Sequence, residues 1–238
     1  MDQLLVALDV DTAVEARALA DRLRGVCGGF KIGSRLFTSH GPSIVEELAA
    51  RGDRVFLDLK FHDIPHTVAG AVAAATRLGA WMINVHASGG AAMMKAARAA
   101  ADEEAARASR PAPIVIAVTM LTSLNDAMLT EVGFAGGVTD QVERLARLAQ
   151  TAGLDGVVAS AQEIALIRRR CGSAFAIVTP GIRGAGDAVG DQSRTMSAAQ
   201  ALAAGSTYLV VGRPIIASAD PRAAAERIGA EWRAADAP

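Results

Sequence analysis

The chain has 238 residues, of which 51% are hydrophobic and 21% charged, and its formal net charge is −1. This composition allows a sizeable core, excludes extensive disorder, and gives no basic field for nucleic acid or an anionic membrane surface. Cys27 and Cys171 stand far apart without a CxxC or Cys/His companion, so we expect reduced thiols and a cytoplasmic protein. We expect neither a signal peptide nor a membrane span, because no stretch has the required apolar length.

Short apolar segments alternate with Ala-, Leu- and Arg-rich amphipathic segments along the whole chain. The apolar segments predict eight strands, at residues 4–9, 28–32, 54–60, 81–86, 114–119, 156–159, 174–179 and 208–211. Capping boxes predict helix starts at residues 12–15, 43–46, 160–163 and 197–200. Further helices are expected at residues 65–78, 90–107 and 140–152, and Asp220-Pro221 opens the last helix.

Eight strand–helix units without a linker predict one domain, residues 1–238, folded as a closed (β/α)8 TIM barrel of the α/β class. The strands are apolar at nearly every position, which is typical of a parallel sheet covered by helices. The main alternative is a doubly wound open sheet. That fold normally carries a glycine-rich turn after its first strand, and Asp9-Val10-Asp11-Thr12 is no such turn.

Charged residues stand at the predicted C-terminal ends of the first three strands, where TIM barrels carry their reacting groups. They are Asp9, Lys31, Asp58, Lys60 and Asp63. Asp58 and Lys60 are two residues apart and should share a strand face, where buried charges are costly unless they are paired. A protonated Lys60 held by Asp58 could donate a proton to a developing carbanion. The structural alternative is a salt-bridged strand end that only stabilises the barrel.

The other polar residues near these strand ends admit ordinary explanations. Asp63 is placed to cap the helix that Pro65 opens. His62 and His66 are four residues apart, as in a metal-binding pair, but Pro65 lies between them and no third ligand is evident. His86, at the end of the fourth strand, is as compatible with a hydrogen-bonded core histidine as with a functional one.

A second group of residues predicts a phosphate site. Thr179-Pro180-Gly181-Ile182-Arg183 follows the seventh strand and Gly212-Arg213 the eighth, and these two loops recurrently bind phosphate in TIM barrels. Glycines let backbone N–H groups approach an anion, and arginine offers a bidentate fork. The glycine-rich residues 183–192 predict a mobile lid, with a plain surface loop as the alternative. Thr122 and Ser123 supply hydroxyls after the fifth strand, which alone is a weak signal.

Together these motifs resemble the orotidine 5′-phosphate decarboxylases of the bacterial type, over essentially the whole chain. The most specific motif is Asp58-Leu59-Lys60-Phe61-His62-Asp63-Ile64-Pro65. The other motifs occur in order at Leu8-Asp9, Phe30-Lys31-Ile32-Gly33, Asn84-Val85-His86-Ala87, Leu121-Thr122-Ser123, Gly153-Leu154-Asp155-Gly156, Thr179-Pro180-Gly181-Ile182-Arg183, Asp191-Gln192 and Val211-Gly212-Arg213. No motif position departs from the pattern of that family.

The resemblance implies a homodimeric barrel that converts orotidine 5′-monophosphate to uridine 5′-monophosphate and carbon dioxide, without metal or organic cofactor, as the last step of de novo pyrimidine synthesis. It implies that Lys60 protonates C6 of the pyrimidine, that Asp58 lies against the departing carboxylate, and that Asp63 enters the other subunit's site. It also implies binding roles for Ile64 and Thr67 across the interface, Lys31 (a member of the catalytic group) and Asp9 at the ribose, Thr122 at the pyrimidine, and Arg183, Gln192, Gly212 and Arg213 at the phosphate.

Two alternatives to this activity stay open from the sequence. A sugar-phosphate decarboxylase or aldolase of the same superfamily shares the Asp-x-Lys-x-x-Asp pattern and uses a divalent metal for an enediolate intermediate. Lys31 and the predicted lid favour the nucleotide enzyme. A phosphometabolite-binding barrel without catalysis is the second alternative, which the five intact charged positions disfavour.

Overall fold

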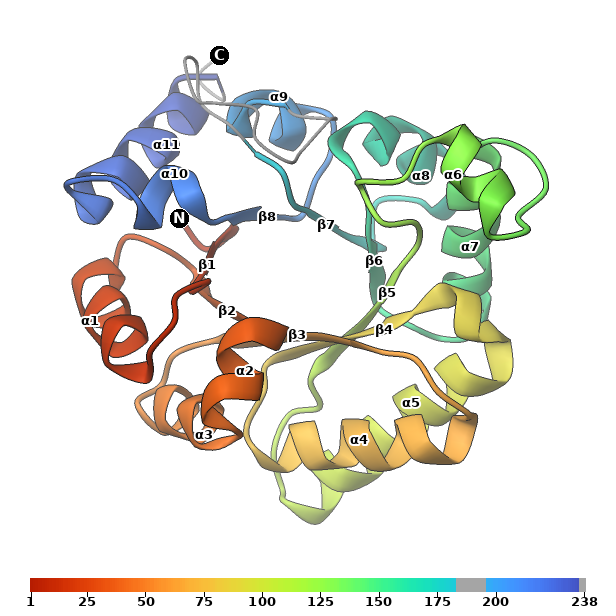
Figure 1. Ribbon diagram of the computed structural model, residues 1–238, viewed down its shortest axis with the longest axis horizontal. Coiled ribbons are helices and arrows are strands. Elements are labelled where there is room, and N and C mark those ends of the chain that lie inside the picture. Colours follow the sequence, from red (N-terminus) through yellow and green to blue (C-terminus); the bar gives the residue numbers. More distant parts are fainter. Residues whose placement is uncertain (183–195, 236–238) are drawn as a thin grey trace.

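The computed structural model describes residues 1–182 and 196–235, with side chains described as far as residue 231. Eight parallel strands close into a barrel in the order of the chain, each paired with its neighbours in sequence (Figure 1). They are β1 (Leu4–Ala7), β2 (Gly29–Gly33), β3 (Val55–Phe61), β4 (Met82–His86), β5 (Ile114–Val118), β6 (Gly156–Val158), β7 (Ala176–Thr179) and β8 (Tyr208–Val211). The TIM barrel is confirmed, and each predicted strand lies within two residues of the observed bounds.

Helices form a ring outside the strands (Figure 1). They are α1 (Ala13–Leu23), α2 (Ser34–His40), α3 (Ser43–Ala50), α4 (Pro65–Arg77), η1 (Ala87–Gly89), α5 (Gly90–Arg107), α6 (Asp126–Glu131), α7 (Val138–Thr151), η2 (Ala161–Glu163), α8 (Ile164–Cys171), α9 (Ala198–Ala203), α10 (Arg213–Ile216) and α11 (Pro221–Ala235). Within residues 1–182 and 196–235, no helix is both long and apolar enough to cross a membrane.

Three of the four predicted capping boxes are confirmed, those that begin at Thr12, Ser160 and Ser197. The prediction at Ser43 was wrong. Helix α3 begins at Ser43 itself, after Pro42, and the Ser43 hydroxyl donates back to the carbonyl of residue 40 instead of capping the helix. A proline preceding the serine can fix the helix start through its own φ angle, so a side-chain cap is not required.

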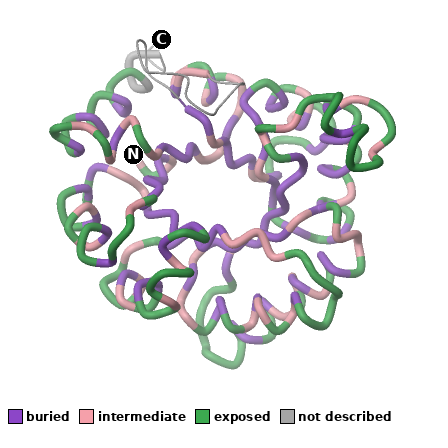
Figure 2. Tube along the Cα trace, viewed as in Figure 1, coloured by how far each residue is buried: buried purple, intermediate pink, exposed green. Residues whose placement is uncertain are grey.

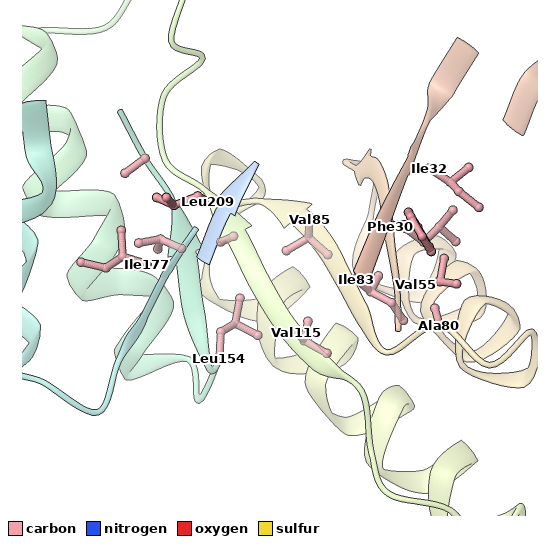
Figure 3. Packing of buried hydrophobic residues seen from close by; sticks show 14 of the residues in the cluster. Phe30, Ile32, Val55, Ala80, Ile83, Val85, Val115, Leu154, Ile177 and Leu209 are labelled. Carbon is pink, nitrogen blue, oxygen red and sulfur yellow. The ribbon is translucent and has the colours of Figure 1, made fainter. Parts of the chain in front are cut away.

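The barrel has two hydrophobic layers because side chains alternate between the two faces of each strand. The outer layer joins strands to helices, and Figure 3 shows part of it around β2, β3, β4 and β5. The inner layer fills the barrel and consists of Leu5, Ala7, Phe56, Met82, Ile116, Val178 and Val210. The strand ring is accordingly largely buried, whereas the outer turns of the helices are largely exposed (Figure 2).

This alternation positions the polar residues at the mouth. Asp9 follows Ala7 by two residues, Asp58 follows Phe56, and Asn84 follows Met82, so each continues the inner face of its strand. Their side chains therefore meet at the C-terminal ends of the strands, above the inner hydrophobic layer. Burial of the inner layer thus fixes the direction in which the polar side chains point.

Candidate active site

Four of the predicted charged residues form a continuous chain of opposite charges at the barrel mouth. The Lys31 ammonium lies 3.2 Å from Oδ1 of Asp9 and 3.3 Å from Oδ2 of Asp58. The Lys60 ammonium lies 2.7 Å from Oδ1 of Asp58. Each ammonium therefore faces a carboxylate at ion-pair distance, and Asp58 pairs with both lysines.

Burial of this chain of charges differs from one member to the next. The side chains of Lys31 and Asp58 are 10% and 12% exposed, whereas those of Lys60 and Asp9 are 36% and 47% exposed. The sequence contains three lysines, and two of them lie in this cluster. Asp58 is thus a fixed, desolvated charge, and Lys60 can reach from it toward a ligand in the mouth.

Strand β3 is irregular where it carries the central pair. Its register with β4 shifts after Leu57, so that residues 58–60 lie opposite the single residue Asn84. Lys60 has φ = +54°, one of two positive values among the described non-glycine residues. Such a conformation costs about 1–2 kcal/mol for an L-residue. In this bulged conformation the Lys60 ammonium lies against Asp58.

Asn84 is a site residue that we did not predict. It is completely buried, its Nδ2 donates to Oδ1 of Asp58 over 2.7 Å, and its Oδ1 accepts from the Lys60 N–H over 2.8 Å. The signal in the sequence was an asparagine between the apolar residues Ile83 and Val85 of this strand. A buried amide of this kind is costly unless all its partners are satisfied.

Two glycines lie beside these charges, and Gly33 makes room for them. A Cβ atom on Gly33 would lie 3.0 Å from the Lys31 ammonium and 3.4 Å from Oδ1 of Asp9. A Cβ atom on Gly212 would lie 3.8 Å from Oδ2 of Asp9. Gly212, predicted to bind phosphate, is therefore a neighbour of the Asp9 carboxylate, and the ends of β1, β2 and β8 converge on one part of the mouth.

The predicted interface residues lie away from the charges of Asp9, Lys31, Asp58 and Lys60. Asp63, Ile64 and Thr67 are all exposed at the start of α4. The predicted cap at Asp63 was wrong, because Ile64 occupies the N-cap position of α4 and no side chain caps it. The Asp63 carboxylate instead accepts from the N–H of Ile64 over 2.6 Å. Pro65 begins the helix as expected.

Two histidines near the mouth, His62 and His86, form a ring pair. The rings of His62 and His86 lie 5.4 Å apart and tilted by 34°, while His66 is exposed on α4. Among residues 1–182 and 196–235, no group of three His, Cys, Asp or Glu side chains is arranged to hold a metal ion. Burial lowers the pKa of His86 below 6.5, and the nearby His62 and Lys60 lower it further, while Asp58 opposes the shift.

We expect this histidine to make the folded state sensitive to acid. Below pH 6.5 the unfolded chain binds a proton at His86 that the folded chain still excludes, so stability falls as the pH decreases from 6.5 toward the folded-state pKa. Solvent screens the half-buried ring, so the loss should stay below about 1 kcal/mol. Urea unfolding at pH 7.5 and 5.5 measures it. His86→Asn should flatten this pH dependence, and His66→Asn, the exposed control, should not; equal slopes for all three proteins would contradict the assignment.

The predicted phosphate side is described only in part. Gly212 precedes α10, a short helix that begins at Arg213, and Thr122 is half-buried after β5. Arg183 and Gln192, together with the predicted lid at residues 183–192, lie outside the described residues. Ile182 and Met196, which flank that segment, pair in an isolated parallel bridge.

A family model for the Orotidine 5′-phosphate decarboxylase / HUMPS family matches residues 2–228. The orotidine 5′-phosphate decarboxylase of Moorella thermoacetica is 56% identical over 231 residues, which cover 97% of this chain and 92% of that protein. The enzyme of the same name from Alkalilimnicola ehrlichii is 54% identical, with coverage of 98% and 97%.

Solved structures agree with the sequence comparisons. The crystal structure of orotidine 5′-phosphate decarboxylase from Lactobacillus acidophilus superimposes with a TM-score of 0.86 at 35% identity, covering 96% of this chain and 98% of that one. The family model and the relatives each span nearly the whole barrel, including β1, β2 and β3 with their charged ends. The chain therefore belongs to the Orotidine 5′-phosphate decarboxylase / HUMPS family.

Proposed function

We propose that the chain decarboxylates orotidine 5′-monophosphate to uridine 5′-monophosphate and carbon dioxide, a step of pyrimidine biosynthesis, with Lys60 as the proton donor to C6. The observation that carries the proposal is the chain of alternating charges from Asp9 to Lys60 at the mouth of a barrel of this family. Loss of carbon dioxide leaves an electron pair at C6, so the site needs a nearby acid and a stabilising positive charge. The Lys60 ammonium can supply both.

Asp58 is proposed to lie against the departing carboxylate. Two negative charges 4 Å apart at an effective dielectric constant of 20 repel by about 4 kcal/mol. Enzymes lower barriers by roughly 8–23 kcal/mol, so this repulsion cannot account for catalysis alone. Stabilisation of the carbanion by Lys60 must supply a further part, and phosphate binding far from C6 can offset the repulsion between Asp58 and the substrate.

Substrate binding is proposed to extend from the ribose to the phosphate. Lys31 and Asp9 would hold the ribose hydroxyls, and their contact at 3.2 Å keeps both side chains oriented toward the mouth. The remaining assignments follow the family pattern, with Thr122 at the pyrimidine and Arg183, Gln192, Gly212 and Arg213 at the phosphate. Gly212 lies beside Asp9. This supports the assignment, because the ribose and the phosphate of a nucleotide are adjacent groups and would need adjacent binding residues.

The functional unit is proposed to be a homodimer in which Asp63, Ile64 and Thr67 enter the partner's site. The described residues include five large apolar side chains that are exposed, and four of them follow β3 or β5, namely Ile64, Leu121, Met128 and Val132. Of these four, Ile64 is one of the three residues proposed to enter the partner's site, and it is 66% exposed. A cytoplasmic location accords with the free thiols of Cys27 and Cys171.

The test of this function is release of labelled carbon dioxide from carboxyl-labelled orotidine 5′-monophosphate. We expect full turnover in excess EDTA, since none of the proposed roles uses a metal. Turnover that EDTA abolishes and magnesium restores would favour the metal-dependent sugar-phosphate enzyme instead. Tight nucleotide binding without turnover would favour the non-catalytic barrel. No observation on the described residues favours either alternative.

A further inference from the structure

We propose that Asn84 is a positioning residue, which orients the Asp58 carboxylate and fixes the Lys60 backbone for the decarboxylation assigned above. The inference rests on that proposed function. Asn84 extends from β4 and is fully buried between the two residues that it contacts. It reaches the reacting atoms only through them and does not itself touch the substrate.

The first contact holds the bulge in β3. Residues 58–60 face the single residue Asn84, so the Lys60 N–H has lost the backbone partner that a regular ladder would offer. The side-chain oxygen of Asn84 accepts from this N–H over 2.8 Å. Because a backbone N–H can only donate, the amide oxygen must be the atom that faces it, and the orientation of the Asn84 amide is settled.

The second contact follows from the first. With its oxygen on Lys60, the Asn84 amide presents its nitrogen to Oδ1 of Asp58 over 2.7 Å. The same oxygen accepts from the Lys60 ammonium over 2.7 Å, while Oδ2 faces Lys31. Two of these donors bond Oδ1 and the third faces Oδ2, so both oxygens of the Asp58 carboxylate are held. A buried carboxylate held in this way cannot rotate when a second negative charge approaches.

Asn84 thereby couples the backbone conformation of Lys60 to the orientation of the Asp58 carboxylate. The left-handed Lys60 backbone aims the ammonium at Asp58, and the oriented carboxylate holds the ammonium in return. An aspartate at position 84 would keep the acceptor for the Lys60 N–H but replace the amide donor with a carboxylate oxygen. This substitution therefore keeps the contact with the Lys60 backbone and removes the donor to Asp58, which separates the two contacts.

The experiment compares Asn84→Ala and Asn84→Asp with the wild type, by kcat, by the Kd of uridine 5′-monophosphate and by Tm, between pH 5.5 and 9. We expect kcat of Asn84→Ala to fall about 10²-fold, the usual effect of a small misplacement of a reacting group. The Kd of the product should change less than about threefold, because the product lacks the carboxylate that Asp58 meets.

Asn84→Asp should show a new pH dependence. A protonated carboxyl at this position can donate to Asp58, so the ratio of its kcat to that of the wild type should increase as the pH is lowered. The control is Thr76→Val, which removes a buried hydrogen bond to the carbonyl of residue 72 within α4. It should lower Tm without changing kcat.

Several outcomes would overturn the role. The first is a folded Asn84→Ala variant whose kcat is within threefold of the wild-type value. The second is an Asn84→Asp variant whose kcat has the same pH dependence as that of the wild type or of Asn84→Ala. If Asn84→Ala does not fold, Asn84→Asp carries the test alone. If the wild type releases no carbon dioxide, both the proposed function and this role are refuted. If the wild type is active and the variants are unaffected, only this role is refuted.

Discussion

Lys60→Ala should abolish decarboxylation while the protein still binds uridine 5′-monophosphate. The variant loses the acid closest to the Asp58 carboxylate, 2.7 Å away, and the positive charge that would stabilise the C6 carbanion. Positioned acids contribute about 10²–10⁴-fold, and preorganised charge about 10²–10³-fold, so kcat should fall by at least about 10⁴-fold. Single-turnover release of carbon dioxide measures the first property, and calorimetric titration with the product measures the second.

The matched control is Lys95→Ala, since Lys95 is the one lysine outside the cluster and is exposed on α5. Its kcat should equal that of the wild type. A Lys60→Ala enzyme with kcat within tenfold of the wild type would refute the role of proton donor. Loss of product binding together with kcat would indicate that the alanine variant has lost the site as a whole, and a circular dichroism spectrum would then show whether the barrel is retained.

The barrel and the four charges at its mouth were predictable because both depend on short-range periodicity. A strand that alternates its side chains places Asp58 on the same face as Phe56, whatever the rest of the chain does. The same rule predicts that Asp9 and Lys31 end neighbouring parallel strands. To predict that these two side chains meet, one further assumption is enough, namely that the strands of the barrel follow each other in chain order.

The bulge in β3 was not predictable, because it depends on two strands at once. Strand periodicity predicted that Asp58 and Lys60 share a face in regular register, whereas the structure gives Lys60 a left-handed backbone. In that conformation the freed Lys60 N–H donates to Asn84 on the neighbouring strand. A partner 24 positions away leaves no periodic signal beside the residue that it stabilises.

Three short helices escaped prediction for a related reason. Helices α2, α6 and α10 have seven, six and four residues, too few turns to repeat an amphipathic pattern. The start of α4 shows the opposite case, in which a plausible local signal was overridden. Asp63 could have capped the helix, yet Ile64 is the N-cap and leaves the carboxylate exposed.

Mixing Asp63→Ala with Lys60→Ala should restore activity that neither protein has alone. Asp63 is exposed, and its Oδ1 accepts from the N–H of the adjacent Ile64, so the carboxylate faces solvent and is available to a partner. In a hybrid dimer both substitutions fall in one site and the other site is complete. Random exchange makes half of the dimers hybrid, so about a quarter of the wild-type activity should return in a two-fold symmetric dimer.

The control for this recovery is a mixture of Lys60→Ala with Asp58→Ala. Lys60 and Asp58 contact each other within one subunit, so no hybrid of these two variants contains a complete site. This mixture should stay inactive under conditions in which differently tagged subunits demonstrably exchange. Equal recovery in both mixtures would show that the assay detects something other than shared sites. If subunits exchange but the mixture with Asp63→Ala recovers no activity, Asp63 acts in the site of its own subunit. The comparison therefore assigns Asp63 to one subunit or the other without requiring a structure of the dimer.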